Sequence, residues 1–122
     1  MRQRASSGAP WEAVVGYSRA TRAGEHVYVT GTTAFLPEGG HVGDGNPYAQ
    51  TRQALANVQA ALEKLGAHLE DVVRTRMFVL DIERDWRAIG RAHQEVLGHV
   101  KPATSMVEVR RLIAPWMLVE VE

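Results

Sequence analysis

The sequence predicts an α+β fold in which one mixed sheet carries two helices on one face, in the element order ββαβαββ. Two segments with helical spacing of apolar residues, 46–66 and 81–99, alternate with segments of alternating or β-branched residues. A strand–helix–strand unit requires parallel strand pairing and a right-handed crossover, so both helices are expected on the same face of the sheet. The length of 122 residues fits a single domain, 1–122.

The N-terminal part is predicted to contain two strands that follow a polar arm. Residues 1–12 are polar and small and are interpreted as the arm. An edge strand is expected over residues 14–20, and a turn at 23–25 leads into an alternating strand at 26–31. A glycine-rich loop follows at 37–45. It lacks the lysine and the serine or threonine of a phosphate-binding loop.

The first helix is predicted to begin at Asn46 and to end before Gly66. Asn46 can cap the helix, and Pro47 suits its first turn because the missing N–H would have no partner there. Gly66 suits the left-handed residue that often follows a helix. One apolar stripe recurs at steps of three and four residues: Thr51, Leu55, Val58, Leu62 and Leu65.

The C-terminal half is predicted to form a strand, a helix and two closing strands. Residues 72–80 are a β-branched strand, and residues 81–99 are a helix that Gly98 and Pro102 terminate. Two alternating strands then follow within 102–112 and 118–122. The candidate inner face of the second helix consists of Trp86, Ile89, His93, Val96 and Leu97.

Strand alternation predicts one face under the helices and a second face without them. The second face is too apolar for a free surface and too charged for a dry core. We expect self-association to bury it, and a solvated sheet is the alternative. The residues expected under the helices are Val27, Val29, Thr75, Met77, Val79, Val107, Val109, Val119 and Val121, and those on the second face are Tyr28, Thr30, Arg74, Arg76, Phe78, Leu80, Met106, Glu108, Arg110, Leu118, Glu120 and Glu122.

Composition excludes several classes of protein. Lys and Arg balance Asp and Glu at 14 each, so no overall field favours nucleic acid or an anionic membrane. The lack of cysteine excludes thiolate catalysis, and the histidines lack helical ligand spacing, so neither a metal nor a cofactor is expected. There is no secretory signal and no apolar run near the roughly 20 residues that span a bilayer. These features predict a soluble, cytoplasmic protein.

Several short pieces occur in a specific order along the chain: Gly16-Tyr17, Val29-Thr30-Gly31, residues 50–57, Phe78-Val79-Leu80-Asp81, Pro102, and Val119-Glu120-Val121-Glu122. In this order and spacing the chain resembles the RidA (YjgF) family, small trimeric proteins many of which hydrolyse reactive enamines and imines. The resemblance implies a chorismate-mutase-like fold in a homotrimer, with three small-molecule clefts between the subunits.

The same resemblance implies a set of site residues. Thr30 matches a hydroxyl that lines the family's cleft, and Gly31 leaves room for the ligand. Glu120 matches the glutamate that positions the attacking water, and the backbone of Met106 would hold the reacting end of the substrate. Tyr17 matches an aromatic residue at the mouth of the cleft.

Three departures from the family pattern affect this site. Active members read Pro-Ala-Arg-Ser, in which the arginine holds the substrate carboxylate, whereas this chain has Thr104 before Ser105. Threonine cannot provide the charge-assisted, two-point contact of an arginine. Gly90 and His93 replace an asparagine and a tyrosine, and a final hairpin longer by one residue brings Trp116 near the cleft.

Several side chains have alternative interpretations. Arg74 and Arg76 either replace the missing arginine from another strand or serve the trimer interface. Glu120 is either a water-positioning acid or base, or a partner of Arg74, Arg76 or Arg110 across a subunit interface. His93 is either a proton carrier or a hydrogen-bonded core histidine.

Three functions are therefore considered. The first is hydrolysis of an imine or enamine that lacks an amino-acid carboxylate, with Glu120, Thr30 and His93 as catalytic residues. The second is a non-catalytic module that binds a metabolite or a protein in the same clefts. RNA cleavage is a weaker third alternative.

Overall fold

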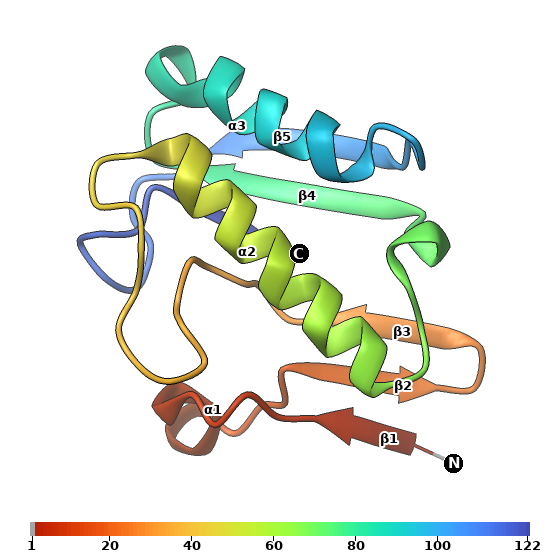
Figure 1. The fold of residues 1–122 in the computed structure, drawn as a ribbon. Helices are drawn as coiled ribbons and strands as arrows, with labels where there is room; N and C mark the ends of the chain where they lie inside the picture. The colour runs from red at the N-terminus through yellow and green to blue at the C-terminus, as the bar shows by residue number, and fades with distance from the viewer. Residues whose placement is uncertain (1) are drawn as a thin grey trace.

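The computed structural model describes residues 2–122 and contains two small sheets with two long helices (Figure 1). Its strands are β1 (Arg2–Ala5), β2 (Ala20–Ala23), β3 (His26–Val29), β4 (Arg74–Val79), β5 (Ala103–Glu108) and β6 (Val119–Val121), and its helices are α1 (Pro10–Val15), α2 (Pro47–Lys64), the 3₁₀ turn η1 (Leu69–Asp71) and α3 (Ile82–Leu97).

The predicted single mixed sheet is wrong, because the strands form two sheets of three strands each. β1, β2 and β3 are antiparallel neighbours in that order. In the second sheet β4 is central, parallel to β5 and antiparallel to β6. One bridge joins the sheets, where Thr32 and Val121 exchange two backbone hydrogen bonds of 2.8 Å. β6 is only three residues long, so the sheets touch there and not along a continuous ladder.

Both long helices pack on the same face of the second sheet. The main core cluster joins Leu55 of α2 and Ile89 of α3 to Met77, Val79 and the valines of β6. Figure 1 shows α2 crossing the molecule obliquely in front of the sheets, with α3 lying beside β5. The β4–α3–β5 unit has the parallel pairing that the sequence predicts.

The start of α2 follows the predicted chemistry. The Asn46 side chain accepts a hydrogen bond of 3.0 Å from the backbone N–H of Ala49, and Pro47 is the first helical residue. The helix ends at Lys64, and Gly66 has a φ of +78°, a left-handed conformation that costs glycine little.

The prediction for the first 20 residues is wrong. Residues 2–5 of the predicted arm form β1, which pairs with β2, and the predicted strand at 14–20 is largely replaced by α1 and the segment after it. Pro10 suits the first turn of this short helix, and Gly16 ends it with a φ of +90°. A short polar strand such as β1 depends on its partner β2 and carries little signal of its own.

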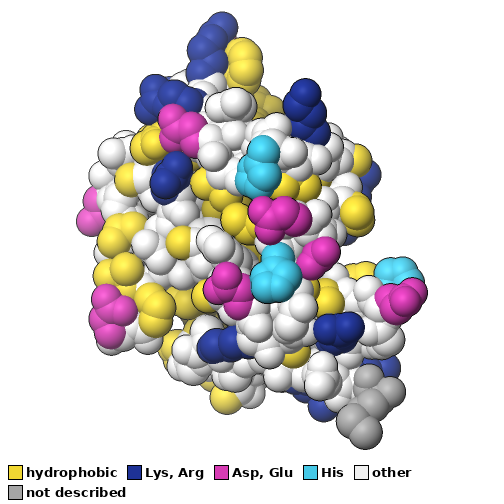
Figure 2. Space-filling model, turned by 45° about the vertical axis from the view of Figure 1, so that its right-hand side comes forward, with side chains coloured by type: hydrophobic (Ala, Val, Ile, Leu, Met, Phe, Trp, Pro, Cys, Tyr) yellow, Lys and Arg dark blue, Asp and Glu magenta, His cyan; other side chains and the backbone are white. Residues whose placement is uncertain are grey.

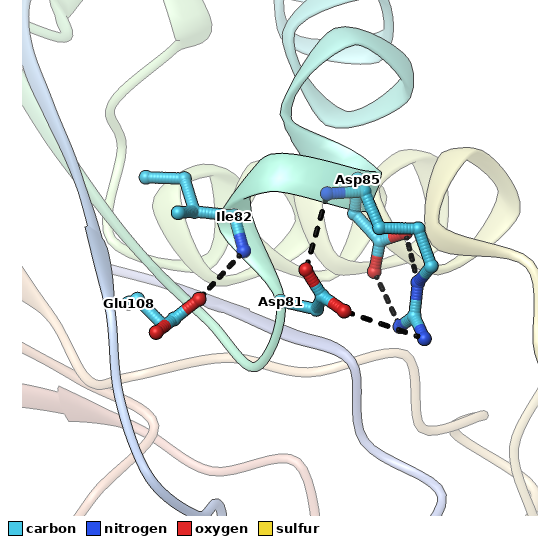
Figure 3. Close-up of polar contacts among 5 residues, drawn as sticks. Asp81, Ile82, Asp85 and Glu108 are labelled. Atoms are coloured by element: carbon cyan, nitrogen blue, oxygen red, sulfur yellow. Dashed lines mark hydrogen bonds and ion pairs between the residues drawn. The ribbon is translucent and has the colours of Figure 1, made fainter.

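The prediction of which residues of β5 face the helices is also wrong. Thr104 stands opposite Thr75, and Met106 stands opposite the buried Met77, so the even-numbered residues of β5 face the helices. Figure 3 shows the carboxylate of Glu108 on this side, where it accepts a hydrogen bond of 3.1 Å from the N–H of Ile82 at the start of α3. Val107 points to the opposite face and is 44% exposed.

The start of α3 is held by a second carboxylate. Asp81 caps the helix by accepting a hydrogen bond from the N–H of Arg84, and the Arg84 side chain contacts Asp85 through two nitrogens (Figure 3). These contacts fix the end of β4 and the beginning of α3, next to the end of β5.

The face without helices is mixed, as the sequence predicts for β3, β4 and β6. Tyr28 is 65% exposed, and Phe78 lies opposite Glu120 on β6. Arg76 forms an ion pair of 2.7 Å with Glu122. The apolar and charged side chains therefore share one surface, which no helix covers (Figure 1).

Gln50 ties three segments together from inside the fold. It is fully buried on α2, and its amide nitrogen donates to the backbone oxygens of Gly43 and Trp116. Its side-chain oxygen accepts a hydrogen bond of 2.8 Å from the N–H of Leu118. The glycine-rich loop and the final hairpin are thus both anchored to the same helix.

We expect Gln50→Leu to destabilise the protein by about 2–4 kcal/mol, because each buried polar group that loses its partner costs about 1–3 kcal/mol. Urea unfolding followed by circular dichroism measures the change. The control is Gln94→Leu at an exposed position of α3. Equal stability of the two variants would contradict the anchoring role of Gln50.

Candidate functional site

Glu120 lies against Gly31 at the junction of the two sheets. A Cβ atom at position 31 would come within 2.5 Å of Oε2 and 2.8 Å of Cδ of Glu120. Only glycine therefore permits this placement of the carboxylate. The sequence predicted that Gly31 leaves room for a ligand. In the single chain, the side chain of Glu120 occupies this space.

The Glu120 carboxylate is poised to take up a proton. Its side chain is half-buried, and this burial raises its pKa above the ordinary value. The positive charge of Arg19 opposes the rise, and the negative charge of Glu122 adds to it. Within residues 2–122, Glu120 takes part in no ion pair. Its pairing with an arginine across a subunit interface stays a prediction.

Arg19 is a site residue that the sequence reasoning missed. It is only 5% exposed, and Nη2 of its guanidinium donates to the backbone oxygen of Gly31. The guanidinium carbon lies 5.6 Å from the ring centroids of both Tyr17 and Phe35. Burial lowers the pKa of Arg19, while Tyr17, Glu12 and Glu120 act in the opposite direction.

Arg19 thus holds the backbone of Gly31 through the hydrogen bond to its carbonyl oxygen. Its Nε atom is buried and has no hydrogen-bond partner among the described residues. The only sequence signal was an arginine directly before the alternating strand β2, which by itself does not distinguish a buried cation from a surface one.

Thr30 and Tyr17 lie together at an open hollow of about 460 Å³ beside α1. The Thr30 hydroxyl donates a hydrogen bond of 2.6 Å to the backbone oxygen of Ser18. Glu12, which is buried, also lines this hollow. The structure therefore brings four of the predicted residues, Tyr17, Thr30, Gly31 and Glu120, into one region.

Thr104 and His93 belong to a second group, connected through Thr75. The Thr75 hydroxyl donates to the Thr104 hydroxyl at 2.7 Å and lies 2.9 Å from Nε2 of His93. Thr75 is buried, His93 is half-buried and Thr104 is exposed. Burial lowers the pKa of His93, so its imidazole is neutral at neutral pH.

The three side chains form a continuous path from a half-buried imidazole through a buried hydroxyl to an exposed hydroxyl. Each hydroxyl can both donate and accept, so the path can carry a proton in either direction. Sequence reasoning identified both ends but not Thr75, which appeared only as one residue of a strand.

The two groups lie on opposite faces of the second sheet. Glu120 is opposite Phe78 on the face without helices, whereas Thr104 is opposite Thr75 on the face under the helices. Adjacent residues of a strand point to opposite faces, so no single chain brings the two groups together.

The remaining predicted residues are distributed around these groups. Met106 packs against the main core cluster, and Ser105 stands opposite Arg76 on the face without helices. Trp116 stacks on His41 of the glycine-rich loop, with ring centroids 3.9 Å apart. These contacts place Trp116 with that loop and give it no contact with Glu120 or Thr104.

On the face seen in Figure 2, Lys and Arg side chains lie near the top and the bottom, and Asp, Glu and His side chains lie between them. Among residues 2–122, no three His, Asp or Glu side chains are grouped as metal ligands would be. No described helix is both long enough and apolar enough to cross a membrane.

Relatives resemble the chain over most of its length. A protein of Streptomyces coelicolor is 42% identical over 120 residues, which cover 98% of this chain and 88% of the relative. A RutC family protein of Pyrococcus abyssi is 35% identical over 79% of this chain and 75% of its own length.

A solved structure also has the same fold. The crystal structure of a YjgF/YER057c/UK114 family member from Mycobacterium tuberculosis has a TM-score of 0.90 and 50% sequence identity, and the match covers 99% of this chain and 95% of that chain.

The family model with the description Endoribonuclease L-PSP matches residues 7–122. This model represents the RidA/YjgF family. This match and the relatives above show that the chain belongs to the RidA/YjgF family.

Proposed function

We propose that the protein is a hydrolase of reactive imines or enamines that lack an amino-acid carboxylate. The observation that carries this proposal is the Glu120 carboxylate, which is half-buried against Gly31 with a raised pKa. A carboxylate in such a place is suited to accept a proton from water and to return it later. Thr30 precedes Gly31 in the chain, and with Tyr17 it lines a hollow that offers a hydroxyl and an aromatic wall.

The active unit is a homotrimer with a cleft at each subunit interface. The mixed face of β3, β4 and β6 favours burial against another copy, because Tyr28 and the arginines of β4 share it. Glu120 and Thr104 point away from each other in one chain, so a contact between two copies is the way to bring Glu120 of one beside Thr104 of the next.

The proposed reaction adds water across the carbon–nitrogen double bond. Glu120 takes a proton from water as the oxygen bonds to the imine carbon, and the nitrogen receives a proton through Thr104. Collapse of the resulting amino alcohol releases ammonia and leaves a carbonyl compound, so one water is consumed for each ammonia. Thr75 connects Thr104 to His93, which exchanges the proton with the path.

Thr104 determines the proposed substrate class. Neither the neutral imidazole of His93 nor the two threonine hydroxyls offers a positive charge to a carboxylate. An uncharged imine avoids the cost of placing an unpaired anion in a partly dry site. As substrates, imines formed by the oxidation of simple amines are therefore favoured over 2-imino acids.

A non-catalytic binding module is the second candidate, and Thr104 is the observation that favours it, because the arginine of active members is absent. RNA cleavage is suggested only by names, those of the family model and of two similar solved structures. The balanced charge of 14 basic and 14 acidic residues does not favour a polyanion as ligand.

The homotrimer predicts a mass of about three times the 13.5 kDa of the chain. Size-exclusion chromatography with light scattering at micromolar concentration measures it. A stable monomer under these conditions would remove the cleft between subunits and, with it, the proposed site.

Glu120→Gln is expected to abolish ammonia release from imines produced in place by an amine oxidase, because the amide cannot accept a proton. In the unchanged protein, activity should rise with pH through the pKa of Glu120, which lies above the ordinary glutamate value, since only the deprotonated form accepts the proton of water. Glu83→Gln, at an exposed position of α3, is the matched control. An active Glu120→Gln trimer would contradict the role of Glu120.

Thr104→Arg is expected to increase turnover of 2-imino acids by roughly tenfold to more than a hundredfold, since a charge-assisted contact contributes about 1.5–3 kcal/mol. Turnover of these substrates, produced by an amino-acid oxidase, is compared with that of Thr104→Gln, which has length without charge. A trimeric Thr104→Arg variant with neither new carboxylate binding nor new turnover would favour the binding module. The different residues at positions 90 and 93 and the longer hairpin would then account for a remodelled pocket.

A further inference from the structure

Helix α3 runs antiparallel to β5 on the helix-covered face of the second sheet. At one end the N–H of Ile82 donates a hydrogen bond of 3.1 Å to Glu108, and near the other end His93 is connected through Thr75 to Thr104. The residues of α3 between these contacts therefore lie along the same stretch of β5 (Figure 1). In the described chain β5 is an edge strand, so this side of α3 lies at the border of the sheet.

Two residues between these contacts share the side of the helix on which His93 lies. Trp86 precedes Gly90 by four residues and Gly90 precedes His93 by three, which is the spacing of neighbours on one helix face. Trp86 was predicted to lie on the inner face of α3, but the residue is 46% exposed. The guanidinium carbon of Arg87 lies 4.6 Å from the centroid of its ring. Trp86 thus offers aromatic surface that the described chain does not bury.

Gly90 leaves open space between Trp86 and His93. Among the described residues, no atom lies within 4 Å of the place where a Cβ atom at position 90 would be. The backbone does not require glycine here, because Gly90 lies inside α3 and has no positive φ. Glycine is also less favourable than alanine within a helix. Neither the backbone nor the packing therefore accounts for the missing side chain.

The surroundings of this space suit a flat apolar group attached to a polar one. Trp86 and His93 are seven residues apart, which corresponds to about 10 Å along the helix. At one end of this distance Thr104 presents an exposed hydroxyl, and between the ends lies Met106, a partly buried residue of β5. Aromatic rings and methionine sulfur both pack favourably against another aromatic ring. An aryl group joined by a short carbon chain to a group at Thr104 has the matching length.

We propose that Trp86 and Gly90 select imines that carry an aryl group, with the ring in the open space at Gly90 and against the indole of Trp86. The nitrogen of the imine then lies at Thr104, as in the proposed reaction. An uncharged aryl imine loses little hydration in this place. Trp86 and Gly90 determine specificity and take no part in proton transfer. The inference rests on the proposed function for the reaction, whereas the aryl site itself is tested by binding alone.

The binding probe is phenylacetamide, an uncharged and unreactive amide, and butanamide is the matched compound without a ring. Calorimetry with the full chain is expected to show that phenylacetamide binds at least about tenfold more tightly, because contact with an aromatic ring adds to the burial of hydrocarbon. Gly90→Leu fills the space and should remove this preference, and Trp86→Ala should reduce it about three- to tenfold.

Two controls separate this effect from a loss of folding. Gly90→Leu should keep or raise the unfolding temperature, because leucine favours a helix more than glycine does. Gln94→Leu introduces the same side chain at an exposed position of α3 and should leave the preference for phenylacetamide unchanged. Equal binding of the two amides by the unchanged protein, or a preference that persists in Gly90→Leu, would overturn the inference.

The activity measurement compares ammonia release from the imines of 2-phenylethylamine and butylamine, both produced in place by an amine oxidase. We expect kcat/KM to be at least about tenfold higher for the aryl imine, and the ratio to fall toward one in Gly90→Leu. A preference for phenylacetamide without any ammonia release would support the aryl site and contradict the proposed hydrolysis. Equal release from both imines, unchanged by Gly90→Leu, would contradict the aryl site and leave the proposed hydrolysis standing.

Discussion

The register of β4 is the constraint on which the rest of the structure depends. Met77, at its centre, is buried under the helices and stands opposite both Met106 and Val121. Since side chains alternate along a strand, burying Met77 also decides which residues of β5 and β6 face the helices. A shift of one residue in either pairing would move Thr104 to the face without helices or Glu120 to the face under them. The separation of the two groups of candidate residues is therefore a consequence of this register.

The bridge between the two sheets has a similar effect on Glu120. Thr32 and Val121 exchange hydrogen bonds, and each is adjacent in sequence to a site residue, Gly31 and Glu120. The bridge consequently brings the Glu120 carboxylate against Gly31, which has no side chain. Arg19 holds the same backbone by donating a hydrogen bond to the carbonyl oxygen of Gly31. Burial raises the pKa of Glu120, and the positive charge of the buried Arg19 opposes this rise.

Local signals in the sequence were sufficient for the two long helices and insufficient for α1 and the short strands. Asn46 and Pro47 define the start of α2 through chemistry that acts within four residues, so the prediction was confirmed at this point. β1 is polar and exposed along most of its length, and it exists because β2 is available as a partner. Valines at 107 and 109 suggested the wrong inner face for β5, because apolar character alone does not reveal that Thr75 and Thr104 bond to each other. Arg19 was missed for the related reason that burial of a charge depends on residues distant in sequence, here Gly31 and Phe35.

The substitution at position 104 changes the chemistry of its surroundings and does not simply remove a contact. An arginine there would carry a permanent charge on the face under the helices. With threonine, the exposed hydroxyl is connected through buried Thr75 to His93, and burial keeps that imidazole neutral. A carboxylate placed at Thr104 would therefore find hydroxyl groups but no cation, and its loss of hydration would be poorly compensated. A neutral group with a nitrogen to protonate would lose little hydration and would meet a path that can carry a proton. Under the proposed function, the same three side chains would disfavour substrates that carry a carboxylate and favour uncharged ones.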